Sequence, residues 1–233
     1  LANGDPLLVA LVIGLLSALA LGLVNGIAVV HLRILPWLVT LATYNIANGL
    51  DLIVTNNKNV AVDNAVVRGV ADNDFLGFPY VLLIMLAMFI FFYVLMHRSR
   101  IGIHIQATGG NPDAALRSGI PVKRLTLLTY LLSGFAVSVG AFLLMTRLSG
   151  STRGVGSLMM LDILLAGYMS AMFSRRSTVN IPGTLIGALF VGTLTNGFTM
   201  INVPTYWVQG IKGGLILLIV SVTSIQQKRR ENE

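Results

Sequence analysis

The feature that most constrains this chain is a series of long apolar runs that contain almost no charged residue. A helix needs roughly 20 apolar residues to cross about 30 Å of hydrocarbon, because it rises about 1.5 Å per residue. Runs near this length cover residues 7–30, 34–50, 75–96, 125–146 and 154–174, and a longer one, 177–227, is interrupted at Pro204. Proline cannot donate to the helix ladder and disfavours helix in the preceding residue, so the last run should form two helices. The sequence therefore predicts an all-α, polytopic transmembrane bundle of about seven spans.

Composition supports a lipid-facing surface. Only 11% of the residues are charged, whereas soluble domains carry about 25%. The net charge of +7 does not favour nucleic-acid binding, because the basic residues lie between the apolar runs, where they anchor loops at a membrane face. Cysteine is absent, so disulfides and thiolate metal sites are excluded. The abrupt start at Leu1 has no signal-peptide pattern and is typical of a fragment.

The basic residues also predict the orientation of the helices. If the loop 97–124 is cytoplasmic, the inner loops carry eleven Lys and Arg residues and the outer loops four, as the positive-inside rule requires. The inner set is Arg33, Arg98, Arg100, Arg117, Lys123, Arg124, Arg175, Arg176, Lys228, Arg229 and Arg230. The outer set is Lys58, Arg68, Arg147 and Arg153, and the polar stretch 55–74 is expected to be the one sizeable outer loop.

Small residues recur at four-residue intervals within the runs. Examples are Gly14, Ala18, Gly22 and Gly26, and later Gly183 and Gly187. Helices in lipid associate through close packing of small residues, so these stripes predict packing seams. A seam along which helices slide during gating is the alternative.

The loop 97–124 contains start and stop signals for a short helix over residues 112–118. Asn111 suits the N-cap and Pro112 the first helical position. Asp113 and Arg117 complement the two ends of the helix dipole, and Gly119 can adopt the left-handed conformation that closes a helix. A helix of about 10 Å does not persist alone in water. We expect it to dock onto a cytosolic partner, or else to pack on its own chain.

Three blocks of sequence resemble a known family. In the first block, residues 107–120 read ATGGNPDAALRSGI and are followed by Val122-Lys123-Arg124. The second block is 183–189, with Asn196-Gly197 and Val203-Pro204 after it. The third block is 211–213. They are similar to the ribose-type (monosaccharide) permeases of ATP-binding-cassette importers, over residues 7–224. Residues 173–180 depart from the Gly-rich turn that many members have there, which bears on the geometry of that inner loop.

The resemblance implies one permease domain over residues 1–233, truncated at its N-terminus, in the bacterial cytoplasmic (inner) membrane. It implies a cytosolic ATPase, a second permease subunit (identical or different), a periplasmic solute-binding protein and membrane lipid as partners, with no nucleic acid. It also implies a coupling helix near 112–118 that receives the stroke of the ATPase. The coupling residues would be Gly109, Gly110, Asn111, Pro112, Asp113, Ala114, Ala115, Leu116, Arg117, Ser118 and Gly119. No cofactor is expected, and the chain lacks the G-x-x-x-x-G-K-[ST] phosphate loop, so ATP hydrolysis is expected on a separate subunit.

Polar side chains at membrane depth mark candidate functional positions. Asn25, Asn45, Asn48 and Asn196 lie within the runs, where polar groups tend to face the bundle interior or a water-filled path. Amides without fixed charge suit a translocation path for a neutral, hydroxyl-rich solute. Hydrogen bonding between helices is the alternative for each of them.

Asp162 and Lys212 are the charges that fall inside predicted spans, about 10 Å from the outer end of each. We expect them to pair, because an isolated buried charge costs several kcal/mol. Alternatively, Lys212 extends outward to the interface while Asp162 lies in a wet vestibule. No catalytic triad, carboxylate dyad or metal-ligand spacing is present, so neither a catalytic nor a metal site is predicted.

The favoured function is ATP-driven import of a small sugar or polyol. The same architecture could carry a nucleoside or a branched-chain amino acid. A gradient-driven secondary transporter would need an intramembrane ionisable relay, for which Asp162 alone is thin support. A membrane scaffold without a path is the third alternative, against which the buried amides argue mildly.

Overall fold

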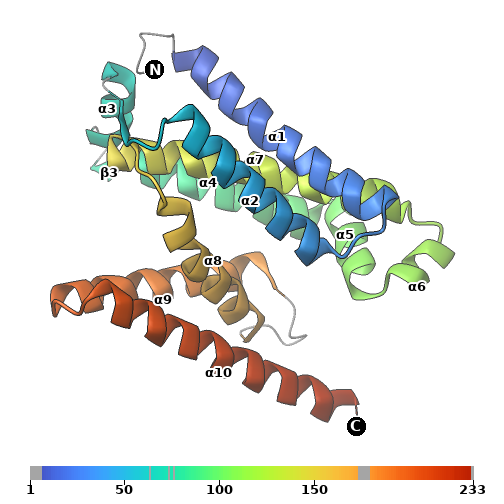
Figure 1. Cartoon of the computed structure of the whole chain (residues 1–233). Coiled ribbons are helices and arrows are strands. Elements are labelled where there is room, and N and C mark those ends of the chain that lie inside the picture. The colour runs from blue at the N-terminus through green and yellow to red at the C-terminus, as the bar shows by residue number, and fades with distance from the viewer. Residues whose placement is uncertain (1–6, 63, 73, 76, 173–178, 232–233) are drawn as a thin grey trace. The chain divides into compact units, whose positions relative to one another are not determined.

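The computed structural model describes residues 7–62, 64–72, 74–75, 77–172 and 179–231. Its helices are α1 Leu7–His31, α2 Pro36–Val54, α3 Ala65–Asp72, α4 Tyr80–Arg98, α5 Arg100–Gly110, α6 Pro112–Arg117, α7 Val122–Leu148, α8 Val155–Met172, α9 Ile181–Met200 and α10 Thr205–Glu231 (Figure 1). Its strands are β1 Val60–Ala61, β2 Asp74–Phe75, β3 Phe78–Pro79 and β4 Gly150–Ser151. The chain divides into two compact units, Leu1–Arg153 and Gly154–Glu233. The expectations for Leu1 and for the inner loop at 173–178, with Arg175 and Arg176, lie outside the described residues.

The predicted spans correspond to seven of these helices, and the prediction of a polytopic helical membrane protein is confirmed. Six helices of the described residues, α1, α2, α4, α7, α8 and α9, are long and apolar enough to cross a membrane. The shorter apolar stretch Tyr206–Val222 lies in α10. The predicted break at Pro204 separates α9 from α10, and Asn202 beside it has a positive φ of 55°.

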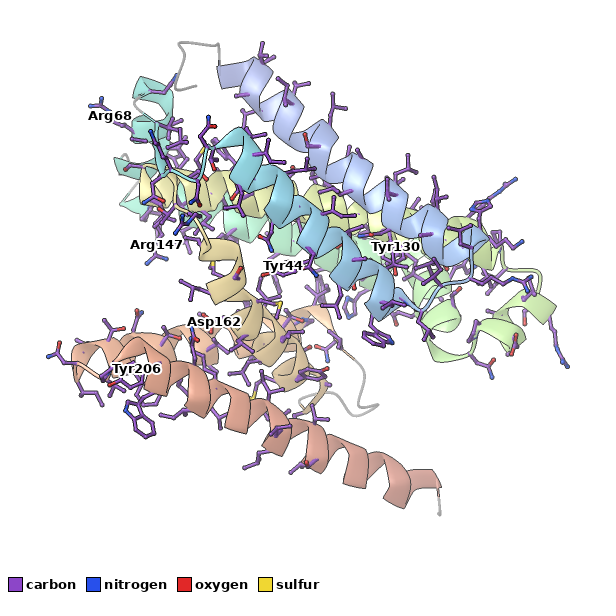
Figure 2. All side chains as sticks on the ribbon, in the orientation of Figure 1. Tyr44, Arg68, Tyr130, Arg147, Asp162 and Tyr206 are labelled. Carbon is purple, nitrogen blue, oxygen red and sulfur yellow. The ribbon has the colours of Figure 1, made fainter. Side chains whose placement is uncertain are left out.

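In the first unit, α1 and α7 form a close seam through small residues. A Cβ on Gly22 would lie 2.6 Å from the carbonyl oxygen of Tyr130, and one on Gly134 would lie 2.6 Å from that of Ala18. Figure 2 labels Tyr130 on α7, beside α1. Gly14 has nothing within 4 Å of its Cβ position, and it lines an open apolar pocket of about 420 Å³ together with residues of α1 and α7. The glycine stripe thus packs closely over only part of its length.

The outer loop expected at 55–74 contains regular structure. β1 pairs with β4 in an antiparallel two-stranded ribbon, Val60 opposite Ser151, and α3 buries Val67. Arg153 donates from its backbone N–H to Asn59 Oδ1 at 3.0 Å, and its guanidinium contacts Asn57. These contacts attach the loop to the segment that follows α7.

In the second unit, α8 packs against both α9 and α10. The core consists of Leu165, Ala166, Val191 and Ile219. A Cβ on Gly187 would collide with the backbone of Ala166, so α8 and α9 are as close as their backbones allow. The expectation that both units belong to one permease domain stays a prediction.

Candidate functional site

The short helix expected in the loop 97–124 is present as α6. Asn111 is its N-cap, and the Asn111 side-chain oxygen accepts a hydrogen bond from the backbone N–H of Ala114 at 3.0 Å. Pro112 occupies the first turn, where its missing N–H costs nothing. Asp113 lies in the first turn and Arg117 in the last, each at the end of the dipole that favours its charge. The helix ends at Arg117, one residue before the predicted end.

The C-terminus of α6 is closed by a Schellman motif. Gly119 has a φ of +78°, and its N–H donates to Leu116 O at 3.0 Å. The N–H of Ile120 reaches Ala115 O at 3.1 Å, and the Ser118 hydroxyl donates to Ala114 O at 2.9 Å. Carbonyls that a helix end normally leaves unpaired are thus satisfied locally, which fixes the shape of this very short helix.

Most of α6 is accessible. Ala115 is its one buried residue, whereas the Leu116 side chain is 62% exposed. Pro112, Asp113, Ala114, Arg117, Ser118 and Gly119 are exposed, as are Gly109 and Gly110 at the end of α5. The helix therefore rests on its own chain through one small residue and presents an outward face with an apolar centre between an acidic and a basic end.

The neighbouring helix α5 was not expected from the sequence. Its N-cap is Ser99, whose hydroxyl accepts from the Gly102 N–H at 3.1 Å. Ser99 stands between Arg98 and Arg100, and these charges favour a solvated loop over a new helix. The signal that could have revealed α5 is the three-residue spacing of Gly102, Ile105 and Thr108, which are its buried or half-buried positions.

The four candidate path amides differ in their surroundings. Asn25 on α1 is half-buried, and its Oδ1 is buried without a hydrogen-bond partner among the described residues. On α2, Asn48 is half-buried, whereas Asn45 is exposed and donates to its own helix at Leu41 O, 2.9 Å away. Asn196 is exposed on α9, in the second unit. Their role as a path stays a prediction.

Asp162 and Lys212 form an ion pair between α8 and α10. Their side chains are 27% and 7% exposed, and Figure 2 labels Asp162 on α8. The Lys212 ammonium therefore faces the carboxylate and does not extend to an interface. Among the described residues, no group of three or more His, Asp or Glu side chains is placed to hold a metal ion.

Comparison with known proteins places the chain among permeases. A family model described as "Branched-chain amino acid transport system / permease component" matches residues 1–220. The L-arabinose ABC transporter permease protein of Azospirillum brasilense is 29% identical over 93% of this chain and 64% of its own length. The ribose import permease protein of Bacillus subtilis is 32% identical over 93% of this chain and 67% of its own length.

The xylose transport system permease protein of Haemophilus influenzae is 32% identical over 67% of this chain and 42% of its own length. The chain thus spans about two thirds or less of the length of these curated relatives. No solved structure matches the chain. The family match over residues 1–220 and the apolar helices together show that this multi-pass membrane protein belongs to the family of transport-system permeases that includes the sugar permeases of ATP-binding-cassette importers.

Proposed function

We propose that this chain is the membrane-spanning permease subunit of an ATP-driven importer for a small sugar or polyol. The arabinose, ribose and xylose named for its relatives support this class of solute. The chain has no phosphate loop, so the energy would come from a separate cytosolic ATPase. A second permease subunit, a periplasmic solute-binding protein and the lipid of the bacterial cytoplasmic membrane would complete the assembly.

The observation that carries the proposal is the geometry of α6. A helix of six residues is far too short to be stable by itself, yet it is capped at both ends and contacts its own chain chiefly through Ala115. Leu116 projects with 62% exposure, which suits an apolar anchor for a groove on a partner. Residues 109–119 would accordingly be the coupling element on which the ATPase pushes.

The solute path would be lined by neutral amides. Asn25 has a buried oxygen without a hydrogen-bond partner in the described part of the chain, so a conformational change that exposed it would offer an acceptor to a hydroxyl donor. Asn45, Asn48 and Asn196 would contribute further amides from α2 and α9. An uncharged lining suits a sugar better than an ionic solute, because a zwitterion would require charged groups along the path.

The Asp162–Lys212 pair would hold α8 against α10 and leave no unpaired charge at that depth. A single ion pair is thin support for the series of ionisable groups that a gradient-driven transporter would need within its spans, which favours ATP over an ion gradient as the energy source. A branched-chain amino acid is the second candidate solute, because the matching family model is described by that transport class.

Uptake into proteoliposomes tests the function directly. Vesicles with the permease, its cognate ATPase and the binding protein should accumulate a labelled pentose when ATP is present and the proton gradient is collapsed. Ribose, arabinose, xylose, leucine and a nucleoside should be compared in parallel. Accumulation that needs the gradient but not ATP would indicate a secondary transporter, and the absence of uptake under both conditions would indicate a scaffold.

A further inference from the structure

The segment between α4 and α6 contains no flexible loop. α4 ends at Arg98 and α5 begins at Arg100, while α5 ends at Gly110 and α6 begins at Pro112. A single residue, Ser99 or Asn111, therefore both ends one helix and caps the next. Figure 1 shows α5 and α6 following one another in this way toward α7.

The Ser99 hydroxyl bonds both helices that it joins. It donates to the carbonyl oxygen of Leu95 in the last turn of α4 at 2.6 Å. It also accepts from the backbone N–H of Gly102 in the first turn of α5 at 3.1 Å. One side chain thus satisfies an end carbonyl of α4 and an end amide of α5, which fixes the angle between them.

Two further contacts hold α5 against the end of α4. Gly102 is buried, and a Cβ there would come within 2.5 Å of Met96 Cα, so the two backbones touch. Gln106, one turn further along α5, donates from its side-chain amide to Met96 O at 2.8 Å. The angle between α4 and α5 is therefore fixed at the junction by Ser99 and one turn further along α5 by Gln106.

At the junction between α5 and α6, Asn111 also bonds both helices, but it uses its backbone for α5 and its side chain for α6. The Asn111 backbone N–H donates to Ala107 O at 3.1 Å, while its side chain caps α6 at Ala114. Rigid elements that have discrete arrangements can carry a displacement between sites, whereas a flexible linker dissipates it.

We propose that Ser99 is a positioning residue that makes α4, α5 and α6 one stiff linkage, so that a displacement of α6 moves the end of α4. The inference rests on the proposed coupling role of α6 and adds the route by which its motion reaches a membrane helix. Ser99 itself would contact neither nucleotide nor solute, and it would act through the angle between α4 and α5.

The test compares Ser99→Ala with Ser99→Thr in the reconstituted importer. Alanine removes both hydrogen bonds, whereas threonine keeps the hydroxyl and remains a good N-cap. Ser17→Ala is the matched control, because the Ser17 hydroxyl bonds Ile13 O within its own helix. The measured quantity is the number of ATP molecules hydrolysed per solute imported.

For Ser99→Ala this ratio should rise by at least about threefold, within the range that coupling mutations produce, while ATPase binding to the membranes stays at the wild-type level. Ser99→Thr and Ser17→Ala should keep the wild-type ratio. An unchanged ratio in Ser99→Ala would overturn the inference even though the proposed function stood. A wild-type importer without ATP-dependent uptake would overturn the function and this inference with it.

Gln106→Ala provides a second variant if Ser99→Ala does not reach the membrane. It removes the exposed hydrogen bond from Gln106 on α5 to Met96 O on α4 and should also raise the number of ATP molecules hydrolysed per solute imported. If Gln106→Ala reaches the membrane in normal amounts and keeps the wild-type ratio, the linkage is not what carries the motion.

Discussion

Breaking the ion pair between α8 and α10 should destabilise the second unit unequally, depending on which charge is left behind. Removal of one partner from a buried pair costs about 3–5 kcal/mol, because an uncompensated charge remains. In Asp162→Leu the remaining Lys212 ammonium has a side chain that is only 7% exposed. In Lys212→Met the remaining carboxylate belongs to a side chain that is 27% exposed, so it is less enclosed and leaves more room for a solvating group than the ammonium does. We therefore expect about 5 kcal/mol for the aspartate variant and about 3 kcal/mol for the lysine variant.

The double variant Asp162→Leu/Lys212→Met should recover most of this loss, because replacing both charges by apolar groups of similar size is often neutral or stabilising. The swap Asp162→Lys/Lys212→Asp should recover part of it. Lys58→Met, at an exposed lysine of the first unit, should change the free energy of unfolding by less than about 0.5 kcal/mol.

The assay is denaturant unfolding in mixed micelles, followed by circular dichroism and by the fluorescence of Trp207 on α10, in a Trp37→Phe background because the chain has two tryptophans. Two single variants that each cost less than about 1 kcal/mol, with costs that simply add in the double variant, would refute the reasoning. That outcome would mean that the pair contributes nothing to holding α8 against α10.

Three other predictions follow from the packing and the turns. Gly187→Val should destabilise the second unit by about 1–3 kcal/mol, because its side chain would collide with the Ala166 backbone; the unfolding midpoint measures this, and an unchanged midpoint would contradict the contact. Arg153→Ala should release the outer ribbon from Asn57 and raise the rate of protease cleavage in residues 56–62 severalfold, whereas unaltered cleavage would show that other contacts hold the ribbon. In Gly119→Pro the proline cannot adopt the φ of +78°, so the end of α6 should be distorted. Membrane insertion should stay intact, while ATP hydrolysis continues without uptake. Normal uptake would contradict a coupling role for α6.

The membrane spans could be predicted from the sequence because their limits are set by local chemistry. Charged residues cannot enter hydrocarbon cheaply, so the C-terminal ends of α1 and α4 and both ends of α7 lie close to Lys or Arg residues. The limits of α6 are also local, because Asn111 and Pro112 mark its start and Gly119 closes its end. Its exposure is a tertiary property that no local pattern contains.

The outer ribbon could not be predicted because its pairing is not local. Val60 and Ser151 are opposite each other although they are 91 positions apart in the chain. The contact between α8 and the start of α9 could not be predicted either. The Ser170 hydroxyl donates to Asn180 O at 2.8 Å, and no sequence motif relates these two residues. The exposure of Asn45 could not be predicted from the sequence, because it depends on how α2 is rotated as it packs against α1.

If α6 is the docking element, another polypeptide contacts its outward face, and site-specific cross-linking detects that contact. The chain contains no cysteine, so Leu116→Cys provides a unique attachment site for a photoreactive probe. Val137→Cys, on the membrane helix α7 with 61% exposure, is the matched control. We expect a covalent adduct with the cytosolic ATPase from position 116 and none from position 137. Labelling of lipid alone from both positions, in vesicles that carry the bound ATPase, would contradict it.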